Sequence, residues 1–95
     1  MSQDPCAVML KALADGIRLG VARQLLDGPR HVWELNASLG IELSLLSHHL
    51  QVLRRAGIVV AKRDGKAVMY QLSKAVESRR RGRVIEFGCC RLVFD

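Results

Sequence analysis

Three cysteines are the residues of this chain best suited to metal or redox chemistry. Cys89 and Cys90 are adjacent near the C-terminus, and Cys6 lies near the N-terminus. Thiolates are soft ligands that select Cu(I), Zn(II) and heavier thiophilic ions, and three thiolates alone would suit As(III) or Sb(III). After Arg83 the chain has no histidine and only two acids, so a mixed-ligand zinc site is poorly supplied. We therefore predict a metal site made of Cys89 and Cys90, with Cys6 joining them.

The same thiols leave other interpretations open. A reversible disulfide or polysulfide would make them a thiol-redox or sulfide/persulfide sensor, and Cys6 alone could be a small buried hydrophobe. Adjacent residues of a strand point to opposite faces, so Gly88 would have to supply a bend that turns Cys89 and Cys90 to one side. An enzyme is disfavoured because the chain contains no Cys-x-x-Cys pair, no Ser/His/Asp set and no phosphate-binding loop.

The charge of the chain indicates a polyanionic partner. Its 95 residues include 15 Lys and Arg against 9 Asp and Glu, a formal net charge of +6, and each phosphate that a cation neutralises releases counterions. The length fits one domain over residues 1–95, whose small core dimerisation would help to stabilise. No apolar run approaches the roughly 20 residues of a membrane span, and residues 1–5 lack the features of a signal peptide. We therefore expect a cytoplasmic protein that does not enter a membrane.

A second set of residues suited to binding lies on the predicted helix over residues 43–56. At about 100° per residue, one arc of this helix collects small polar, imidazole, amide and guanidinium groups, namely Ser44, Ser47, His48, Gln51 and Arg55. The opposite arc is apolar and contains Leu45, Leu46, Leu50, Val52 and Leu53. The polar groups can hydrogen-bond base edges and phosphates, and their arc holds no carboxylate that would repel DNA. An ordinary amphipathic surface helix is the alternative, but such helices usually mix Glu and Lys.

Two basic residues follow at a predicted β-hairpin. Two runs of residues that favour strands flank Asp64-Gly65, which is a strong hairpin signal. Arg63 and Lys66 bracket this turn, where they could contact phosphates or the minor groove. A turn that only improves solubility is the alternative.

Helix and strand signals elsewhere in the chain predict the elements that position the cysteines and the proposed DNA-binding residues. Asp4-Pro5 and Asp15 indicate helix starts, and Gly40 and Gly57 indicate helix ends. The predicted helices cover residues 5–13, 16–27, 31–39 and 43–56, the hairpin strands cover 58–63 and 67–72, and one or two further strands cover 84–87 and 91–94. Helices followed by a hairpin are the order of an α+β winged helix-turn-helix domain, in which the last helix enters the major groove.

Several predictions concern residues outside these two sets. The core would span about residues 5–73, followed by a β-like tail over residues 74–95 that carries two of the cysteines. His49 points into the apolar arc of its helix, so we expect it to be packed with a satisfied hydrogen bond. Trp33 is expected to pack against the helical core. The run from Arg79 to Arg83 is expected to form a solvated turn between β segments, with extra phosphate contact as the alternative.

Four segments of the chain resemble the ArsR/SmtB family of metal-sensing repressors, namely residues 10–19, 44–58, 63–66 and 70–72. The resemblance covers roughly residues 8–73. Its combination of Ser-x-x-Ser-x-His-Leu, Val-Leu-Arg-x-Ala-Gly and an Arg-Asp-Gly wing is specific. It implies a homodimer on an inverted-repeat operator in double-stranded DNA, with repression relieved by an inducer. Ser44, Ser47 and His48 sit where the recognition helix of the family faces DNA.

The chain departs from the family pattern at its recognition helix and at its metal sites. Glu42-Leu43 stands where many members have Ser-Gln, a difference that concerns the operator sequence. Residues 32–39 lack the Cys-x-Cys of the family's arsenic site, and no histidine follows His49, so the zinc site of the last helix is also absent. The inducer is therefore expected at the cysteines, as As(III), Sb(III) or another thiophilic metal ion, and no cofactor is expected for folding. The resemblance makes a three-cysteine cluster feasible, within or between subunits, because the first helix and the C-terminal segment usually lie together in the family dimer.

Overall fold

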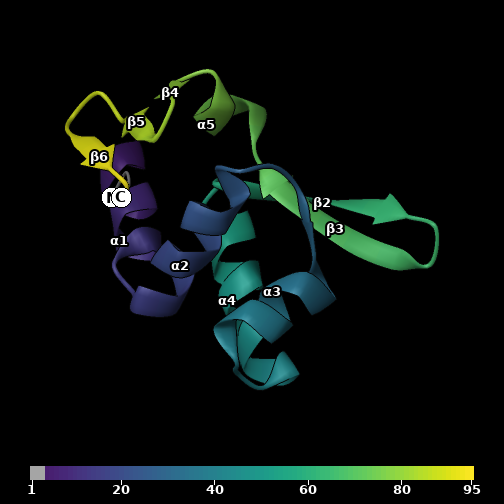
Figure 1. Ribbon diagram of the computed structural model, residues 1–95. Coiled ribbons are helices and arrows are strands. Elements are labelled where there is room, and N and C mark those ends of the chain that lie inside the picture. The colour runs from purple at the N-terminus through teal and green to yellow at the C-terminus, as the bar shows by residue number, and fades with distance from the viewer. Residues whose placement is uncertain (1–3) are drawn as a thin grey trace.

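The structure is a computed structural model that describes residues 4–95 (Figure 1). Its helices are α1 (Pro5–Leu13), α2 (Gly16–Leu25), α3 (Val32–Leu39), α4 (Leu43–Arg55) and α5 (Lys74–Glu77). Its strands are β1 (Arg30–His31), β2 (Val59–Asp64), β3 (Ala67–Leu72), β4 (Arg80–Arg81), β5 (Val84–Glu86) and β6 (Arg91–Val93). Four helices precede the β2–β3 hairpin, which confirms the predicted α+β winged helix-turn-helix order.

Local side-chain chemistry sets the helix ends. The Asp4 carboxylate accepts a hydrogen bond from the backbone N–H of Cys6 (2.9 Å), and the Asp15 carboxylate accepts two from the first turn of α2 (2.9 and 3.1 Å). Such N-caps contribute about 1 kcal/mol each. Gly40 and Gly57 follow α3 and α4 with φ of +63° and +79°, a left-handed conformation that residues with a Cβ adopt only at a cost. The starts and ends predicted at these residues are confirmed.

Two three-stranded antiparallel sheets complete the fold. The first has the order β1-β3-β2, with Arg30 opposite Tyr70 and His31 opposite Met69. Its β2–β3 hairpin projects from the helical body as the wing (Figure 1). The second sheet has the order β4-β5-β6 and lies beside α1, away from the wing tip (Figure 1). β1 was not predicted from the sequence, because a two-residue strand carries no periodicity.

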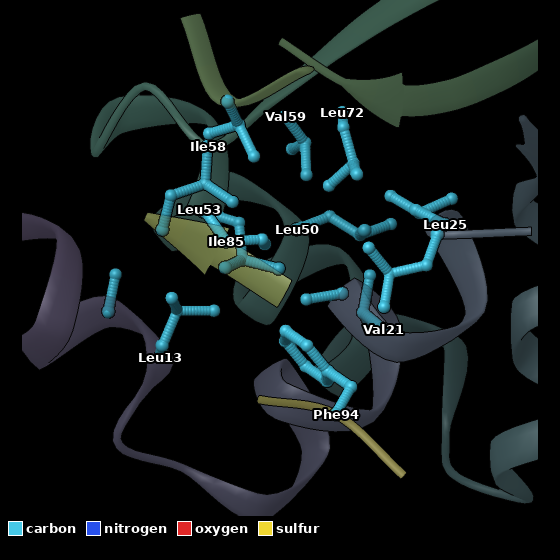
Figure 2. Close-up of a cluster of buried hydrophobic side chains, with 14 of the residues drawn as sticks. Leu13, Val21, Leu25, Leu50, Leu53, Ile58, Val59, Leu72, Ile85 and Phe94 are labelled. Carbon is cyan, nitrogen blue, oxygen red and sulfur yellow. The ribbon is translucent and has the colours of Figure 1, made fainter. Parts of the chain in front are cut away.

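One hydrophobic core joins the helices, the wing base and the tail (Figure 2). The largest fully buried side chains of the helices are Leu25, Leu35, Leu46, Leu50 and Leu53. The tail adds Ile85, Phe87 and Phe94, each at most 5% exposed. Figure 2 shows Ile85 and Phe94 among side chains from α1, α2 and α4. Because each buried CH2 contributes about 0.8 kcal/mol, these three residues attach the tail to the helical body.

The tail differs from its prediction in two respects. Residues 74–77 form one helical turn, α5, which begins at Ser73: the Ser73 hydroxyl donates to the Gly57 carbonyl (2.8 Å) and accepts from the Val76 N–H (3.3 Å). The tail then contains three strands rather than one or two. Arg80–Arg81 is itself a strand, so the arginine run is only partly a turn, centred on Gly82 with φ of +59°.

The predicted limits of two helices differ slightly from the structure. α2 ends at Leu25 rather than Asp27, and α3 begins at Val32 because His31 is its N-cap residue and belongs to β1. Within residues 4–95, none of the helices combines the length and the apolar character needed to cross a bilayer.

Candidate nucleic-acid interface and cysteine cluster

α4 carries the predicted polar residues on its solvent side. Four of them are exposed and Gln51 is half-buried; the exposed four are Ser44, Ser47, His48 and Arg55. The buried side chains of the helix are Leu46, His49, Leu50 and Leu53. Leu45, which the helical pattern places with the apolar arc, is 43% exposed, although its neighbour Leu46 is fully buried. We call the five polar residues together the α4 polar face.

His49 fixes α4 to α2. Its side chain is buried, and its Nδ1 accepts a hydrogen bond from the Arg18 guanidinium at 3.0 Å. The Asp15 carboxylate lies 3.9 Å from the same nitrogen. The backbone N–H of Arg18, and after it that of Ile17, lowers the pKa of Asp15, so this carboxylate stays ionised beside the pair. The prediction of a packed histidine with a satisfied hydrogen bond is confirmed.

The wing tip carries the predicted basic pair. Arg63 and Lys66 are both exposed. Asp64 pairs with Ala67, so the two-residue turn is Gly65-Lys66, one residue later than predicted. Gly65 has φ of +64°, which hairpin turns of this length require. Lys66 therefore lies in the turn itself, and Arg63 lies in the second residue pair of the hairpin.

His31 joins the wing to α3, a link that the sequence analysis did not predict. Its Nδ1 lies 2.9 Å from Glu34 Oε1, and its Nε2 lies 2.8 Å from Asp64 Oδ2. Hydrogen bonds first to Asp64 and then to Glu34 raise the pKa of His31 above its ordinary 6.5. The His-x-x-Glu spacing resembles a capping box, and Glu34 Oε1 does accept the His31 backbone N–H (2.8 Å). That spacing could have indicated the local contact, but nothing in the sequence connects His31 to Asp64.

The prediction that Trp33 packs against the helical core is wrong. Trp33 is 66% exposed in the first turn of α3. Its ring stacks on His31, with ring centroids 5.8 Å apart and an angle of 15° between the planes. The buried residue of α3 is Leu35, and two residues correspond to about 200° around a helix. Trp33 therefore points away from the core.

The three cysteines lie together where α1 meets the tail. Cys6 in α1 and Cys89 in the loop between β5 and β6 form a disulfide, with Cα atoms 6.4 Å apart. Cys90 is free and half-buried, and its Sγ lies 3.9 Å from that of Cys89. Gly88, with φ of +88°, makes a bend immediately before the pair. The structure thus brings the three predicted residues together within one chain, with Cys6 in α1 and with Cys89 and Cys90 in a loop rather than on a strand.

Hydrogen bonds hold the backbone of the loop that carries Cys89 and Cys90. The Phe87 N–H donates to the Cys90 carbonyl (2.9 Å), and Arg79 donates to the Phe87 carbonyl (3.3 Å). In this disulfide-bonded form, no group of three or more His, Cys, Asp or Glu side chains within residues 4–95 is arranged to hold a metal ion. A cysteine ligates a metal ion as its thiolate, and two of the three cysteine sulfurs are joined to each other. A three-thiolate site here therefore requires reduction of the disulfide.

Comparison with known proteins identifies the class. Residues 15–60, which include α2, α3 and α4, match the family described as "Bacterial regulatory protein, arsR family". The chain is 44% identical over 66 residues to the HTH-type transcriptional regulator NmtR of Mycobacterium tuberculosis, covering 70% of this chain and 55% of NmtR. It is 36% identical over 86 residues to CmtR of Mycobacterium bovis, covering 90% of this chain and 73% of CmtR. A homodimeric winged helix-turn-helix DNA-binding domain from Mycobacterium bovis is similar in structure, with a TM-score of 0.72 and 35% identity over 76% of this chain and 67% of that one.

The fold and these matches define a winged helix-turn-helix domain of the kind found in transcriptional regulators. The chain belongs to the ArsR family of bacterial regulatory proteins, which confirms the resemblance found in its helix and wing segments. It spans about half the length of NmtR. NmtR and CmtR are both described as HTH-type transcriptional regulators.

Proposed function

We propose that this chain is a repressor that binds double-stranded operator DNA as a homodimer. The observation that carries the proposal is the α4 polar face, which is exposed beside a basic wing. In winged helix-turn-helix proteins this helix enters the major groove. The side chains proposed to contact base edges and phosphates are Ser44, Ser47, His48, Gln51 and Arg55. Arg63 and Lys66 are proposed to contact phosphates or the minor groove from the wing.

The dimer is supported by the Mycobacterium bovis neighbour, which is described as homodimeric. In a dimer, two copies of α4 would contact half-sites about 34–36 Å apart on an inverted repeat. Sedimentation equilibrium at the concentrations used for DNA binding is expected to give twice the chain mass. A monomer that binds the operator with full affinity would contradict the dimer.

Fluorescence anisotropy with promoter DNA tests the DNA contacts. Affinity should fall steeply as salt rises, because phosphate contacts release counterions. The double variant Ser47→Ala/His48→Ala should weaken specific binding at least about tenfold, or about 1.4 kcal/mol. Ser78→Ala is the matched control, since Ser78 is also exposed but follows α5 in the tail. An absence of binding even at low salt would contradict the proposal.

Release from DNA is proposed to depend on Cys6, Cys89 and Cys90. Two cellular thiols first reduce the Cys6–Cys89 disulfide: they supply two electrons and two protons, become a disulfide themselves and leave Cys6 and Cys89 as thiols. The three thiols then replace the three hydroxyls of As(OH)3 and release three waters, giving a ligand set suited to As(III), Sb(III) or another thiophilic ion. Because Cys6 belongs to α1 and the other two to the tail, capture fixes a new arrangement of both. This shifts the population toward a dimer geometry in which the two copies of α4 no longer match successive major grooves of the operator.

A thiol-redox or sulfide/persulfide-sensing repressor is the second candidate, and the Cys6–Cys89 disulfide is the observation that favours it. In this case a peroxide accepts two electrons from the two thiols, which form the disulfide while the peroxide yields water and an alcohol. Cys90, with its Sγ 3.9 Å from that of Cys89, can exchange with the disulfide by thiolate attack. Formation of the disulfide joins α1 to the tail, and its reduction separates them.

Cys90→Ser separates the two candidates. This variant loses one of the three thiolates but keeps the Cys6–Cys89 pair. Reduced protein on operator DNA is titrated with As(III), Sb(III), Cd(II), Zn(II), Pb(II), a peroxide and a persulfide donor. Metalloid sensing predicts that As(III) releases the wild type at a much lower concentration than Cys90→Ser. Redox sensing predicts that peroxide releases both proteins alike and that As(III) releases neither.

A further inference from the structure

An apolar groove lies beside the α4 polar face, between α3, α4 and the wing. Its walls include Trp33 from α3, Leu43 and Ser47 from α4, and Val68 from β3, and its volume is about 410 Å³. Trp33 and Leu43 are 66% and 57% exposed. Large apolar side chains are often exposed singly, but a shared exposed surface indicates a binding site.

We infer that this groove receives the C5-methyl groups of thymines, so that Trp33 and Leu43 select A·T pairs in the operator. The inference rests on the proposed DNA binding and adds a determinant of sequence preference. Ser47 belongs both to the α4 polar face and to the wall of the groove, so the groove continues the proposed DNA-binding surface. In the major groove, the thymine methyl is the apolar group that base edges present.

The charge around the groove fits DNA as its occupant. Arg63 is the cross-strand partner of Val68, and cross-strand partners project from the same face of a hairpin. A cation therefore stands beside the groove, where it can neutralise a phosphate. The carboxylates of Glu34 and Asp64 are both hydrogen-bonded to His31, which reduces their repulsion of DNA. A further carboxylate, of the exposed Glu42, directly precedes Leu43.

The stacked ring of His31 also holds Trp33 in position. His31 contacts carboxylates through both ring nitrogens, and Trp33 stacks on it. A side chain that is already held in its binding geometry loses little conformational entropy when the ligand arrives. Trp33 can therefore remain exposed in the free protein and still contribute to sequence selection.

The test begins with selection of a binding site from random double-stranded DNA by the wild-type chain. Each thymine of the selected site is then replaced by deoxyuridine, which pairs identically but lacks the methyl group. Wild-type binding should weaken about fourfold at one or two positions, the effect of one buried methyl group. Leu43→Ala and Trp33→Ala should bind the two DNAs with equal affinity at the corresponding positions. Val93→Ala, which removes an exposed apolar side chain of the tail sheet, should keep the fourfold preference.

The outcomes distinguish this inference from the proposed function. A chain that selects no DNA site contradicts DNA binding itself. A chain that selects a site without thymines, or that binds thymine and deoxyuridine equally at every position, retains DNA binding and overturns the inference. The inference is also overturned if both variants keep the thymine preference, or if they lose oligomeric mass instead, which would make the groove an interface between copies of the chain. Circular dichroism melting verifies that the variants are folded.

Discussion

The half of the molecule that carries the α4 polar face and the wing, which we propose binds DNA, is held in place by different means from the tail. α4 buries side chains over its middle turns, from Leu46 to Leu53, and His49 connects it to Arg18 of α2. The strands of the tail contain two or three residues each. The tail is attached to the helices by a few apolar side chains and by one disulfide to α1.

This difference separates a rigid part of the molecule from a responsive one. The buried side chains of α4 are closely packed in the core, so the helix cannot shift without opening the core. The α4 polar face therefore keeps a fixed position relative to the other helices. Segments with few buried contacts open at a lower free energy than the core. The tail is such a segment, and its attachment includes a bond that reduction breaks. Chemistry at the cysteines can therefore alter the tail while the helices stay folded.

The largest effect is expected from the core of the rigid half. Leu53→Ala removes a fully buried side chain of α4 and should lower the free energy of unfolding by about 2–5 kcal/mol, through lost burial and a cavity. Leu45→Ala, the same change on the same helix at an exposed position, should alter it by less than about 0.5 kcal/mol. Urea unfolding followed by circular dichroism measures both. Equal losses in the two variants would contradict the burial of α4 described here.

Reduction of the disulfide should have a smaller effect, confined mainly to the tail. The bond connects residues 83 positions apart, and disulfides that close long loops typically contribute about 2–4 kcal/mol. Urea unfolding with and without a reductant should show a loss of this size in the wild type and in Cys90→Ser, but not in Cys6→Ser. Hydrogen exchange should accelerate in β5 and β6 and stay slow in α4. Equal acceleration in α4 would remove the distinction between the two halves.

The wing should contribute to DNA affinity through the charge of its side chains rather than through packing. Arg63→Ala/Lys66→Ala should lower the slope of log affinity against log salt by about two, since each phosphate contact contributes about one. Arg91→Ala is the control, because Arg91 is also exposed but lies in the tail, where it pairs with Glu86 (3.0 Å). If the tail variant changes the slope as much as the wing variant, the DNA-facing surface extends over both halves.

The smallest effect on the free energy of unfolding is expected from substitution of His31, which connects the wing to α3. Its pKa is raised by Asp64 and Glu34, so the stabilisation is fully present below the ordinary value of 6.5 and is lost as pH rises through the raised pKa. The stability advantage of the wild type over His31→Gln should therefore shrink as pH rises above 6.5. An NMR titration of Asp64→Asn should show the His31 pKa moving back toward 6.5. An advantage that does not change with pH would contradict the charged link.

The sequence predicted the parts of the molecule that local patterns determine. The N-caps at Asp4 and Asp15, the polar and apolar arcs of α4 and the hairpin at Gly65 each depend on neighbours within a few residues. The parts that were missed depend on distant partners. β1 exists because it pairs with β3, and Trp33 is exposed because the core meets the other side of α3.

The cysteine cluster lies between these two cases. Residue type suggested that Cys6, Cys89 and Cys90 act together, but no local pattern could show that a disulfide would join α1 to a loop 83 residues away. The sheet that positions this loop is built from strands too short to give a periodic signal. The residues of the site could thus be predicted from the chemistry of cysteine, but their arrangement could be seen only in the folded structure.

The most direct test of the account is DNA release by the wild type compared with Cys89→Ser/Cys90→Ser. Both proteins, reduced and bound to labelled operator DNA, are titrated with As(III), Sb(III) and a thiol oxidant while anisotropy is recorded. Because the α4 polar face is fixed independently of the tail, both should bind DNA with the same initial affinity. At least one effector should release the wild type and leave the double variant bound. Release of both proteins at the same effector concentrations would contradict control of the DNA-binding half by the cysteines.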